Sequence, residues 1–211
     1  MAEPKELKPA YPTMSRRERK KRETRRRILE AALELMAKRS YAEVKIEEIS
    51  AAADVANATF FLHFPTKASL ITAFNEEVAA KIAAALAGFS GTAVSKLEQL
   101  RTMLLAEWRK HRNLMRQLLT EFVAQPASMA AFPEVNHSLV DLVADVIRDG
   151  QTAQEFDGRL DPFIVGLSLV STWNAIAIGW ARTGNAEQAT EANRQALDLV
   201  LRGVMRPKEA A

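Results

Sequence analysis

The segment KIEEISAAADVANATFFLHFPTK, residues 45–67, decides the fold of this chain. Its apolar residues recur at helical spacing, which predicts a short helix from Ile46 to about residue 53 and a second one over residues 57–64. We expect a tight turn between them at Asp54. The second helix ends before Pro65, because a proline pushes the preceding residue out of the α region.

The side chains of this segment divide between two faces. Helices this short bury too little apolar surface to be stable alone, so they require the helix just upstream. A unit of three such helices with a polar rim and a basic flank is typical of a helix-turn-helix that reads the DNA major groove. The inward face consists of Ile46, Ile49, Ala53, Val55, Phe60 and Phe64, and the outward face of Asn57, Ala58, Thr59, Leu62 and His63.

Positive charge is concentrated at the N-terminal end. The 211 residues include 29 Lys and Arg against 26 Asp and Glu, a net charge of +3. Residues 1–27 hold 11 basic and 4 acidic residues (net +7), which leaves 18 basic and 22 acidic residues (net −4) for the remainder. We therefore expect one region, rather than the whole surface, to meet a polyanion.

The rest of the chain predicts helices only. The basic run over residues 16–27 leads into a helix, and no stretch alternates with period two for long enough to be a strand, so the fold class is all-α. The chain has no cysteine, which excludes disulfides and thiolate metal sites and suits a reducing cytosol. Further helical periods are expected over residues 66–88, 94–111, 113–122, 135–148, 162–183 and 187–205.

Residues 163–181 are uncharged and about as long as a membrane-spanning helix. Polar residues, among them Ser168 and Asn174, interrupt the segment, and no second candidate exists. We therefore expect no membrane association and a helix buried on most sides in a soluble bundle. Residues 1–27 are charged where a signal peptide would be apolar, so the expected location is the cytoplasm.

Three pieces of the N-terminal region carry a family resemblance: TRRRILEAALELMAKRSY (24–41), IEEISAAADV (46–55) and NATFFLHFPTKASLI (57–71). Together they resemble the DNA-binding region of the tetracycline-repressor (TetR/AcrR-like) family of bacterial transcription regulators. The FFxxFPxK ending of the last piece is the most specific part. The chain length and the all-helical remainder of the chain, called the body below, also fit the family. The sequence beyond residue 71 resembles no particular member.

The resemblance implies an N-terminal three-helix DNA-binding domain with a helix-turn-helix and a C-terminal helical bundle for ligand binding and dimerisation. We place a basic, disordered arm at residues 1–22, the helix-turn-helix DNA-binding domain at 23–67 and the effector-binding and dimerisation domain at 68–211. The resemblance further implies a homodimer. Its two DNA-binding domains, called the readers below, enter successive major grooves about 34–36 Å apart, so the double-stranded DNA operator should be a near-palindrome. A small-molecule effector in the body would shift the readers apart.

The expected DNA-binding residues are those of the helix-turn-helix that suit base edges or phosphates. Asn suits adenine, Thr suits a phosphate or a methyl group, and an exposed Leu suits a thymine methyl, while Lys and Arg neutralise phosphates. The set is Arg26, Lys45, Asn57, Ala58, Thr59, Phe61, Leu62, His63 and Lys67.

Several positions depart from the family pattern. Asp54 replaces the usual turn glycine, and aspartate tolerates the left-handed conformation. Ala56 replaces the serine that caps the reader helix, a loss of about 1 kcal/mol. Phe61 replaces a tyrosine, and Lys45 replaces a threonine cap. These changes leave the fold expectation intact and make the operator sequence unpredictable.

Large and polar side chains in the body suggest an effector pocket. Aromatic residues at helical spacing form a core more often than a pocket, so this expectation also rests on the resemblance and on polar groups in an apolar setting. The effector should be apolar or amphipathic. The expected ligand-binding residues are Trp108, His111, Met115, Leu119, Phe122, Leu139, Val143, Trp173 and Asn174.

The last two helices are expected to form the dimer face, because their small residues allow close helix approach. Those residues are Gly166, Ser168, Ala175, Ala177, Gly179 and Ala181 on the first helix, with Ala189, Ala192 and Ala196 on the second.

Catalysis has little support. The three histidines lie at no metal-ligand spacing, and no glycine-rich phosphate loop or nucleophile elbow is present. We therefore expect no enzyme activity, no metal and no cofactor. The expected function is a ligand-responsive regulator, most simply a repressor released from its operator by an effector. The alternatives are an activator or corepressor-dependent regulator and, from another class, an α-helical carrier or enzyme with a nonspecific nucleic-acid-binding tail.

Overall fold

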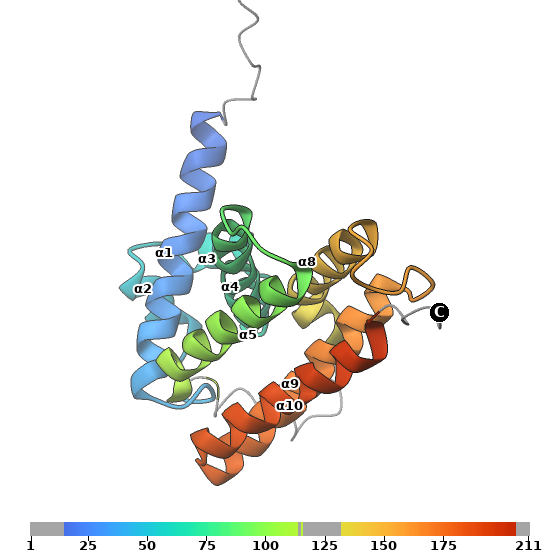
Figure 1. Cartoon of the computed structure of the whole chain (residues 1–211). Helices are drawn as coiled ribbons and strands as arrows, with labels where there is room; N and C mark the ends of the chain where they lie inside the picture. Colours follow the sequence, from blue (N-terminus) through green and yellow to red (C-terminus); the bar gives the residue numbers. More distant parts are fainter. Residues whose placement is uncertain (1–14, 114, 116–131, 206–211) are drawn as a thin grey trace, which may run out of the picture.

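A computed structural model describes residues 15–113, 115 and 132–205 of the chain. In this part the chain forms eight α-helices and no strand, so the all-α prediction is confirmed (Figure 1). The helix expected over residues 113–122 lies almost entirely outside the described residues. The helices are α1 (Arg16–Lys38), α2 (Ile46–Ala52), α3 (Asn57–His63), α4 (Ser69–Ala87), α5 (Ala93–Lys110), α8 (Phe132–Thr152), α9 (Pro162–Thr183) and α10 (Ala186–Val204).

Helices α1, α2 and α3 pack together as the sequence predicts. Phe60 and Phe64 of the reader segment are fully buried, with ring centroids 5.7 Å apart, beside Ile28 and Ile49 in the same core. Each buried aromatic ring contributes about 1.5–3 kcal/mol of hydrophobic stabilisation, which is large for a helix of seven residues. These two rings therefore fix the orientation of α3.

Helix α1 begins earlier than the expected arm allows. Ser15 accepts a hydrogen bond from the Glu18 backbone N–H at 3.2 Å, and the Glu18 carboxylate accepts one from the Ser15 N–H at 2.8 Å. This capping box starts a single helix that runs from Arg16 to Lys38. The expectation of an arm through residue 22 is wrong for residues 16–22, which form the projecting end of α1 in Figure 1; residues 1–14 lie outside the described part.

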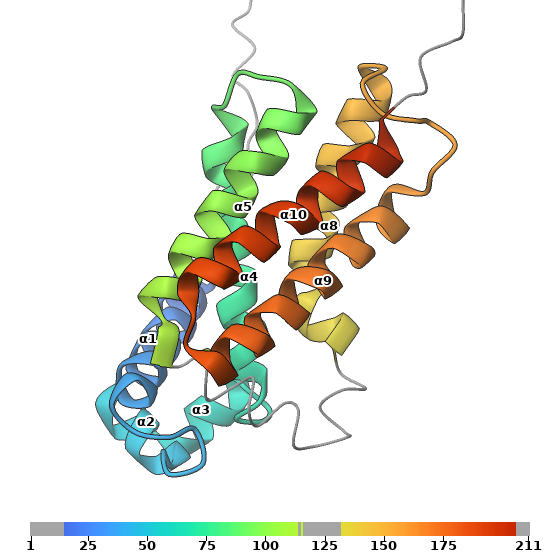
Figure 2. The ribbon, with the colours of Figure 1, turned by 60° about the horizontal axis from the view of Figure 1, so that its bottom comes forward.

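The remaining helices form the body. Helix α4 packs against both α8 and α5, α8 packs against α9, and α10 lies against α9 and α5 (Figure 2). The predicted stripe on α4, which includes Leu70, Phe74, Val78 and Ile82, is buried. One continuous apolar core extends from the reader into the body. Helix α4 is therefore a stiff connection between the two parts.

Several small residues of α9 and α10 pack inside the chain rather than facing a partner. A Cβ atom at Gly166 would lie 2.8 Å from the Val140 carbonyl oxygen of α8, so this glycine permits the close approach of α8 and α9. Ala177 and Ala196 are buried against the same core. Assignment of these three residues to a dimer face is therefore wrong. Ser168, Ala175 and Gly179 are exposed.

Helix α9 is less enclosed than expected. By length and composition, Pro162–Trp180 is a candidate membrane span, but only 33% of its most apolar window is buried within the chain. Phe163 and Ile164 are 48% and 56% exposed. The expectation of a helix buried on most sides is thus wrong for a single chain, because α8 and α10 cover only part of its circumference.

Candidate DNA-binding surface and effector cavity

Helix α3 lies at the rim of the reader and presents a mixed face to solvent. Asn57 and Ala58 are exposed, Phe61 is 51% exposed and Leu62 is 79% exposed. Asp54 adopts a φ of 52° in the preceding turn, as its tolerance of the left-handed region predicts. A large apolar side chain as exposed as that of Leu62 is suited to a contact with another molecule.

Thr59 and His63 are half-buried, so their place on the outward face is only partial. The Nδ1 atom of His63 is buried, and no described residue forms a hydrogen bond with it. Burial, followed by the positive charges of Lys21 and Arg25, lowers the pKa of His63 below its usual value. The ring is therefore mainly neutral at pH 7, and it adds polarity rather than charge to the rim.

The two lysines among the expected DNA-binding residues differ in their contacts. Lys67 donates to the backbone carbonyl oxygen of Tyr41, and its Nζ lies 4.2 Å from the centroid of the Tyr41 ring. This holds the turn before α4 against the end of α1. Lys45 is exposed just before α2, where its backbone N–H donates to Glu48 at 2.9 Å.

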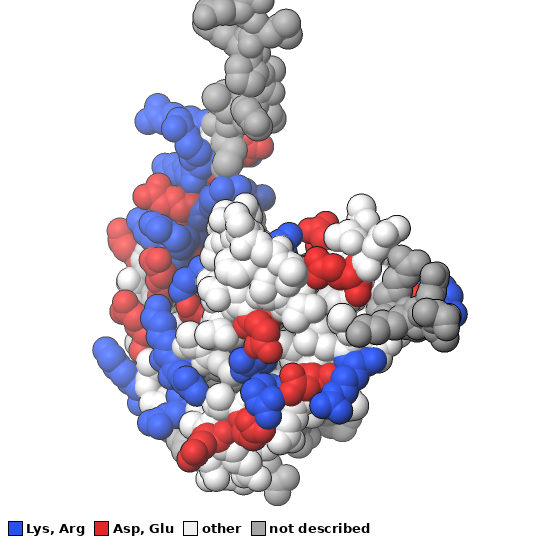
Figure 3. Space-filling model, viewed as in Figure 1, with Lys and Arg blue, Asp and Glu red and all other residues white. Residues whose placement is uncertain are grey.

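Exposed cations follow the whole N-terminal half of α1. Figure 3 shows Lys and Arg side chains gathered along this helix. Arg26 belongs to the row and lies 3.8 Å from Glu30, one turn further on. Such a row can neutralise phosphates along a DNA backbone without reading bases. Its other exposed members are Arg16, Arg17, Arg19, Lys20, Lys21, Arg22 and Arg27.

Arg25 joins three helices, a role that the sequence alone did not reveal. Its Nη1 donates to the carbonyl oxygen of His63 at 2.9 Å, and its Nη2 donates to the Glu76 carboxylate at 2.9 Å. The guanidinium also lies 4.6 Å from the centroid of the Phe64 ring. Arg25 on α1 therefore ties the end of α3 to α4.

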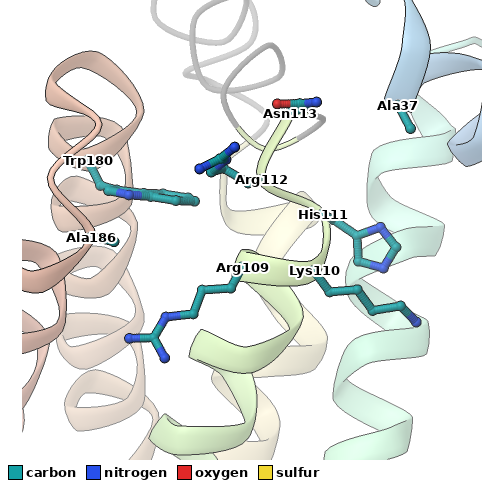
Figure 4. Close-up of a pocket in the computed structure, with 8 residues that line it drawn as sticks. All are labelled: Ala37, Arg109, Lys110, His111, Arg112, Asn113, Trp180 and Ala186. Atoms are coloured by element: carbon teal, nitrogen blue, oxygen red, sulfur yellow. The ribbon is translucent and has the colours of Figure 1, made fainter.

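The body contains a cavity of about 310 Å³ at the C-terminal end of α5 (Figure 4). In Figure 4, Arg112 and Trp180 point toward one another, whereas Lys110 and His111 point toward α4. None of the described lining residues is acidic. The described lining residues are Ala37, Arg109, Lys110, His111, Arg112, Asn113, Trp180 and Ala186.

A narrower slot of about 20 Å³ adjoins this cavity, and the two share Arg109, Trp180 and Ala186. The slot has mostly apolar walls and holds little more than one water molecule. Trp180 is 7% exposed, and its Nε1 is buried with no hydrogen-bond partner in the part of the chain that the structure describes. The remaining slot residues are Leu105, Trp108, Ile176, Ala177, Ala189 and Thr190.

Polar groups also meet inside the bundle. The Asn136 Oδ1 atom accepts hydrogen bonds from Asn75 and Asn174, each at 3.4 Å. Trp173, the residue before Asn174 on α9, is fully buried, and its Nε1 has no hydrogen-bond partner among the described residues. Among the described residues, no group of three His, Asp or Glu side chains is placed to hold a metal ion.

Only some of the expected ligand-binding residues line the cavity or the slot. His111 lines the cavity and Trp108 lines the slot. Leu119 and Phe122 lie outside the described residues. The sequence analysis missed Arg109 and Arg112; the basic run after Trp108 was a signal, but its placement depends on where α9 and α10 pack. Met115, Leu139, Val143, Trp173 and Asn174 are buried but are not described lining residues of either hollow.

The cavity contacts α4 through the end of α5. The His111 ring lies edge-on to Phe74, with centroids 5.1 Å apart. Glu107 forms an ion pair with Lys81 of α4 and lies 3.9 Å from His111. Burial, followed by the charge of Lys110, lowers the pKa of His111. The end of α5 that lines the cavity is therefore in contact with the helix that leads to the DNA-binding domain.

A rim helix anchored by two buried aromatics, a basic helix beside it and a hollow helical body define a helix-turn-helix transcription regulator. Residues 28–74 match the family described as "Bacterial regulatory proteins, tetR family". This match covers the DNA-binding region and, with the curated relatives, supports a TetR-family transcriptional regulator. Regulators of this family bind DNA operators and small-molecule effectors and act as dimers.

Relatives agree with this assignment. The chain is 29% identical over 189 residues to the HTH-type transcriptional repressor KstR of Mycolicibacterium smegmatis, covering 86% of each chain. Its fold resembles that of Thermus thermophilus FadR, a transcriptional repressor solved in complex with lauroyl-CoA, with a TM-score of 0.71, 24% identity and coverage of 89% and 98% of the two chains. FadR from Bacillus halodurans gives a TM-score of 0.65 at 20% identity, with coverage of 84% and 98%.

Proposed function

We propose that this regulator is a repressor that binds a near-palindromic operator as a homodimer and is released by an amphipathic effector. The exposed face of α3, held in place by buried Phe60 and Phe64, is the observation that carries the proposal. Repression is favoured over activation because KstR and FadR are both named as repressors. The DNA-binding domain ends near residue 67, and the body begins with α4.

Exposed small residues on α9 support the homodimer. Ser168, Thr172, Ala175 and Gly179 are all exposed and recur every three or four residues, so they form one continuous face. Leu199 on the neighbouring α10 is 73% exposed. Pairing this face with its copy would bury apolar surface that a single chain leaves in water, in a two-fold arrangement.

The two hollows support an amphipathic effector. The slot at Trp108 and Trp180 is too narrow for an alkyl chain, so a chain could enter only by separating α5 from α9 and α10. An acyl thioester such as the lauroyl-CoA bound by Thermus thermophilus FadR has the required apolar chain and polar head. Binding and displacement of helices suffice for this function, and we assign the chain no catalytic step, metal or cofactor.

The route between effector and DNA follows α4. Movement at the end of α5 acts on α4 through the Glu107–Lys81 ion pair and the Phe74–His111 contact. Arg25 and Glu76 pass the movement to the end of α3. Such coupling is typically worth about 1–3 kcal/mol and is reciprocal, so the operator must weaken effector binding by the same factor. This repressor acts in the cytoplasm, where its DNA lies.

Selection from random DNA tests the proposal. The full-length protein should enrich one inverted repeat, and footprinting should show protection of both halves on the same face of the duplex. Diffuse protection without an enriched repeat would instead indicate nonspecific binding through α1 and would overturn the proposal.

Glu76→Gln should weaken the coupling between the two sites. The change removes the charge that holds Arg25 at 2.9 Å while keeping the side-chain shape. We expect the effector-induced loss of operator affinity to shrink by about fivefold, with little change in affinity when no effector is present. Fluorescence anisotropy with and without a saturating acyl thioester measures both quantities. The control is Glu77→Gln, one residue away and without an ion pair among the described residues; equal effects of the two variants would contradict the role of Arg25.

A further inference from the structure

The cavity at the end of α5 has a charge that a purely apolar effector would not need. Arg109, Lys110 and Arg112 all line it, and none of them forms an ion pair with a described residue. Within the part of the chain that the structure describes, the Arg109 side chain donates to the Thr190 hydroxyl, at 2.8 Å. The nearest acidic side chain on the same helix, Glu107, already pairs with Lys81.

The helix dipole of α5 explains why two of these three cations lie here, but it does not explain the third. Cations in the last turn of a helix interact favourably with its C-terminal carbonyl groups, which accounts for Arg109 and Lys110. Arg112 lies beyond the end of α5, and Figure 4 shows it extending across the opening toward Trp180. The position of Arg112 is therefore unexplained by the stability of α5.

Trp180 supplies a second, independent observation. Its side chain is more than nine-tenths buried, it lines both the cavity and the slot, and its Nε1 donor has no acceptor among the described residues. A buried donor without an acceptor costs free energy that a ligand oxygen would recover. Arg112 and Trp180 face each other across the opening, beside a slot with mostly apolar walls, so together they fit a ligand with a negatively charged oxygen group and an apolar chain.

We propose that this cavity binds the anionic head of the effector, a carboxylate or a phosphate, with Arg112 as the main cation and Trp180 Nε1 as a hydrogen-bond donor. The apolar chain then enters the slot beside Trp108 as α5 separates from α9 and α10. This inference rests on the amphipathic effector proposed above and adds the charge of its head and the residues that select it. Arg112 and Trp180 are specificity-determining residues, because a neutral head would leave both without a partner.

Three probes that share one alkyl chain test the inference on the full-length protein: dodecanol, dodecanoate and dodecanoyl-CoA, each below its micellar concentration. Calorimetry should show that the two anions bind about tenfold more tightly than dodecanol. Arg112→Gln should remove about that factor for the anions and leave dodecanol unchanged, and Trp180→Phe should act in the same direction. A preference for dodecanoate indicates a carboxylate site, and a preference for the thioester indicates a phosphate site.

Arg148→Gln is the matched control, because Arg148 is an exposed cation on α8 paired with Asp145, and it should change no affinity. Equal binding of all three probes, equal losses for all three in Arg112→Gln, or no binding at all would overturn the inference. Operator occupancy is measured in the same samples. If all three probes bind and release the operator equally, the repressor proposal stands and the anionic site fails. If the anions bind selectively without releasing the operator, the site stands and the effector role fails.

Discussion

Leu62→Glu should abolish specific operator binding while the protein remains folded. Leu62 is 79% exposed near the C-terminal end of α3, so its replacement disturbs no packing, and surface changes of this kind usually alter stability by less than about 0.5 kcal/mol. In the groove, however, the new carboxylate would lie between two phosphate backbones and would lose any contact with a thymine methyl. We expect the specific affinity to fall by about 100-fold or more, close to the nonspecific level.

Fluorescence anisotropy on the selected operator and on random DNA, with thermal unfolding of the same samples, measures this effect. Arg26→Gln is the control, because Arg26 belongs to the basic row on α1. It should weaken binding to both DNAs alike and reduce the slope of log affinity against log salt by about one. If Leu62→Glu binds the operator within about threefold of the unmodified protein, α3 does not read this DNA.

The reader was predictable from sequence because its constraints are local. Phe60 and Phe64 lie four residues apart and must share a helix face, and a proline directly afterwards ends that helix. The early start of α1 was also readable. Ser15 and Glu18 have the spacing of a capping box, but the basic composition that follows them favoured an arm.

The body was less predictable because its constraints are between helices. Helix α9 is apolar around most of its surface, so its sequence does not say that Gly166 faces α8 or that Gly179 faces solvent. The cavity was not predictable from the sequence for the same reason. Arg112 and Trp180 are far apart in sequence, and they meet only because α5 and α9 end near each other in space.

Leu199→Glu should convert the dimer to a monomer and remove most operator affinity. Leu199 is 73% exposed on α10, the helix that packs against α9. In a two-fold interface the same residue contributes from both chains, so one substitution introduces two carboxylates into one apolar contact. Burying an unpaired charge costs several kcal/mol, which exceeds what a surface contact of this kind supplies.

The loss of the dimer should be visible in DNA binding because the two readers are linked. Once one α3 of a dimer is bound, the second α3 enters the next major groove without a second loss of translational freedom. The operator affinity of a dimer is therefore about 100-fold or more above that of a single DNA-binding domain. Light scattering at micromolar concentration should therefore give the monomer mass for Leu199→Glu, and operator affinity should fall by a similar factor. Ala84→Glu adds the same charge at an exposed position of α4 and should leave both quantities unchanged. A dimer mass for Leu199→Glu would place the interface on another surface, and the exposed face of α9 would then need a different partner.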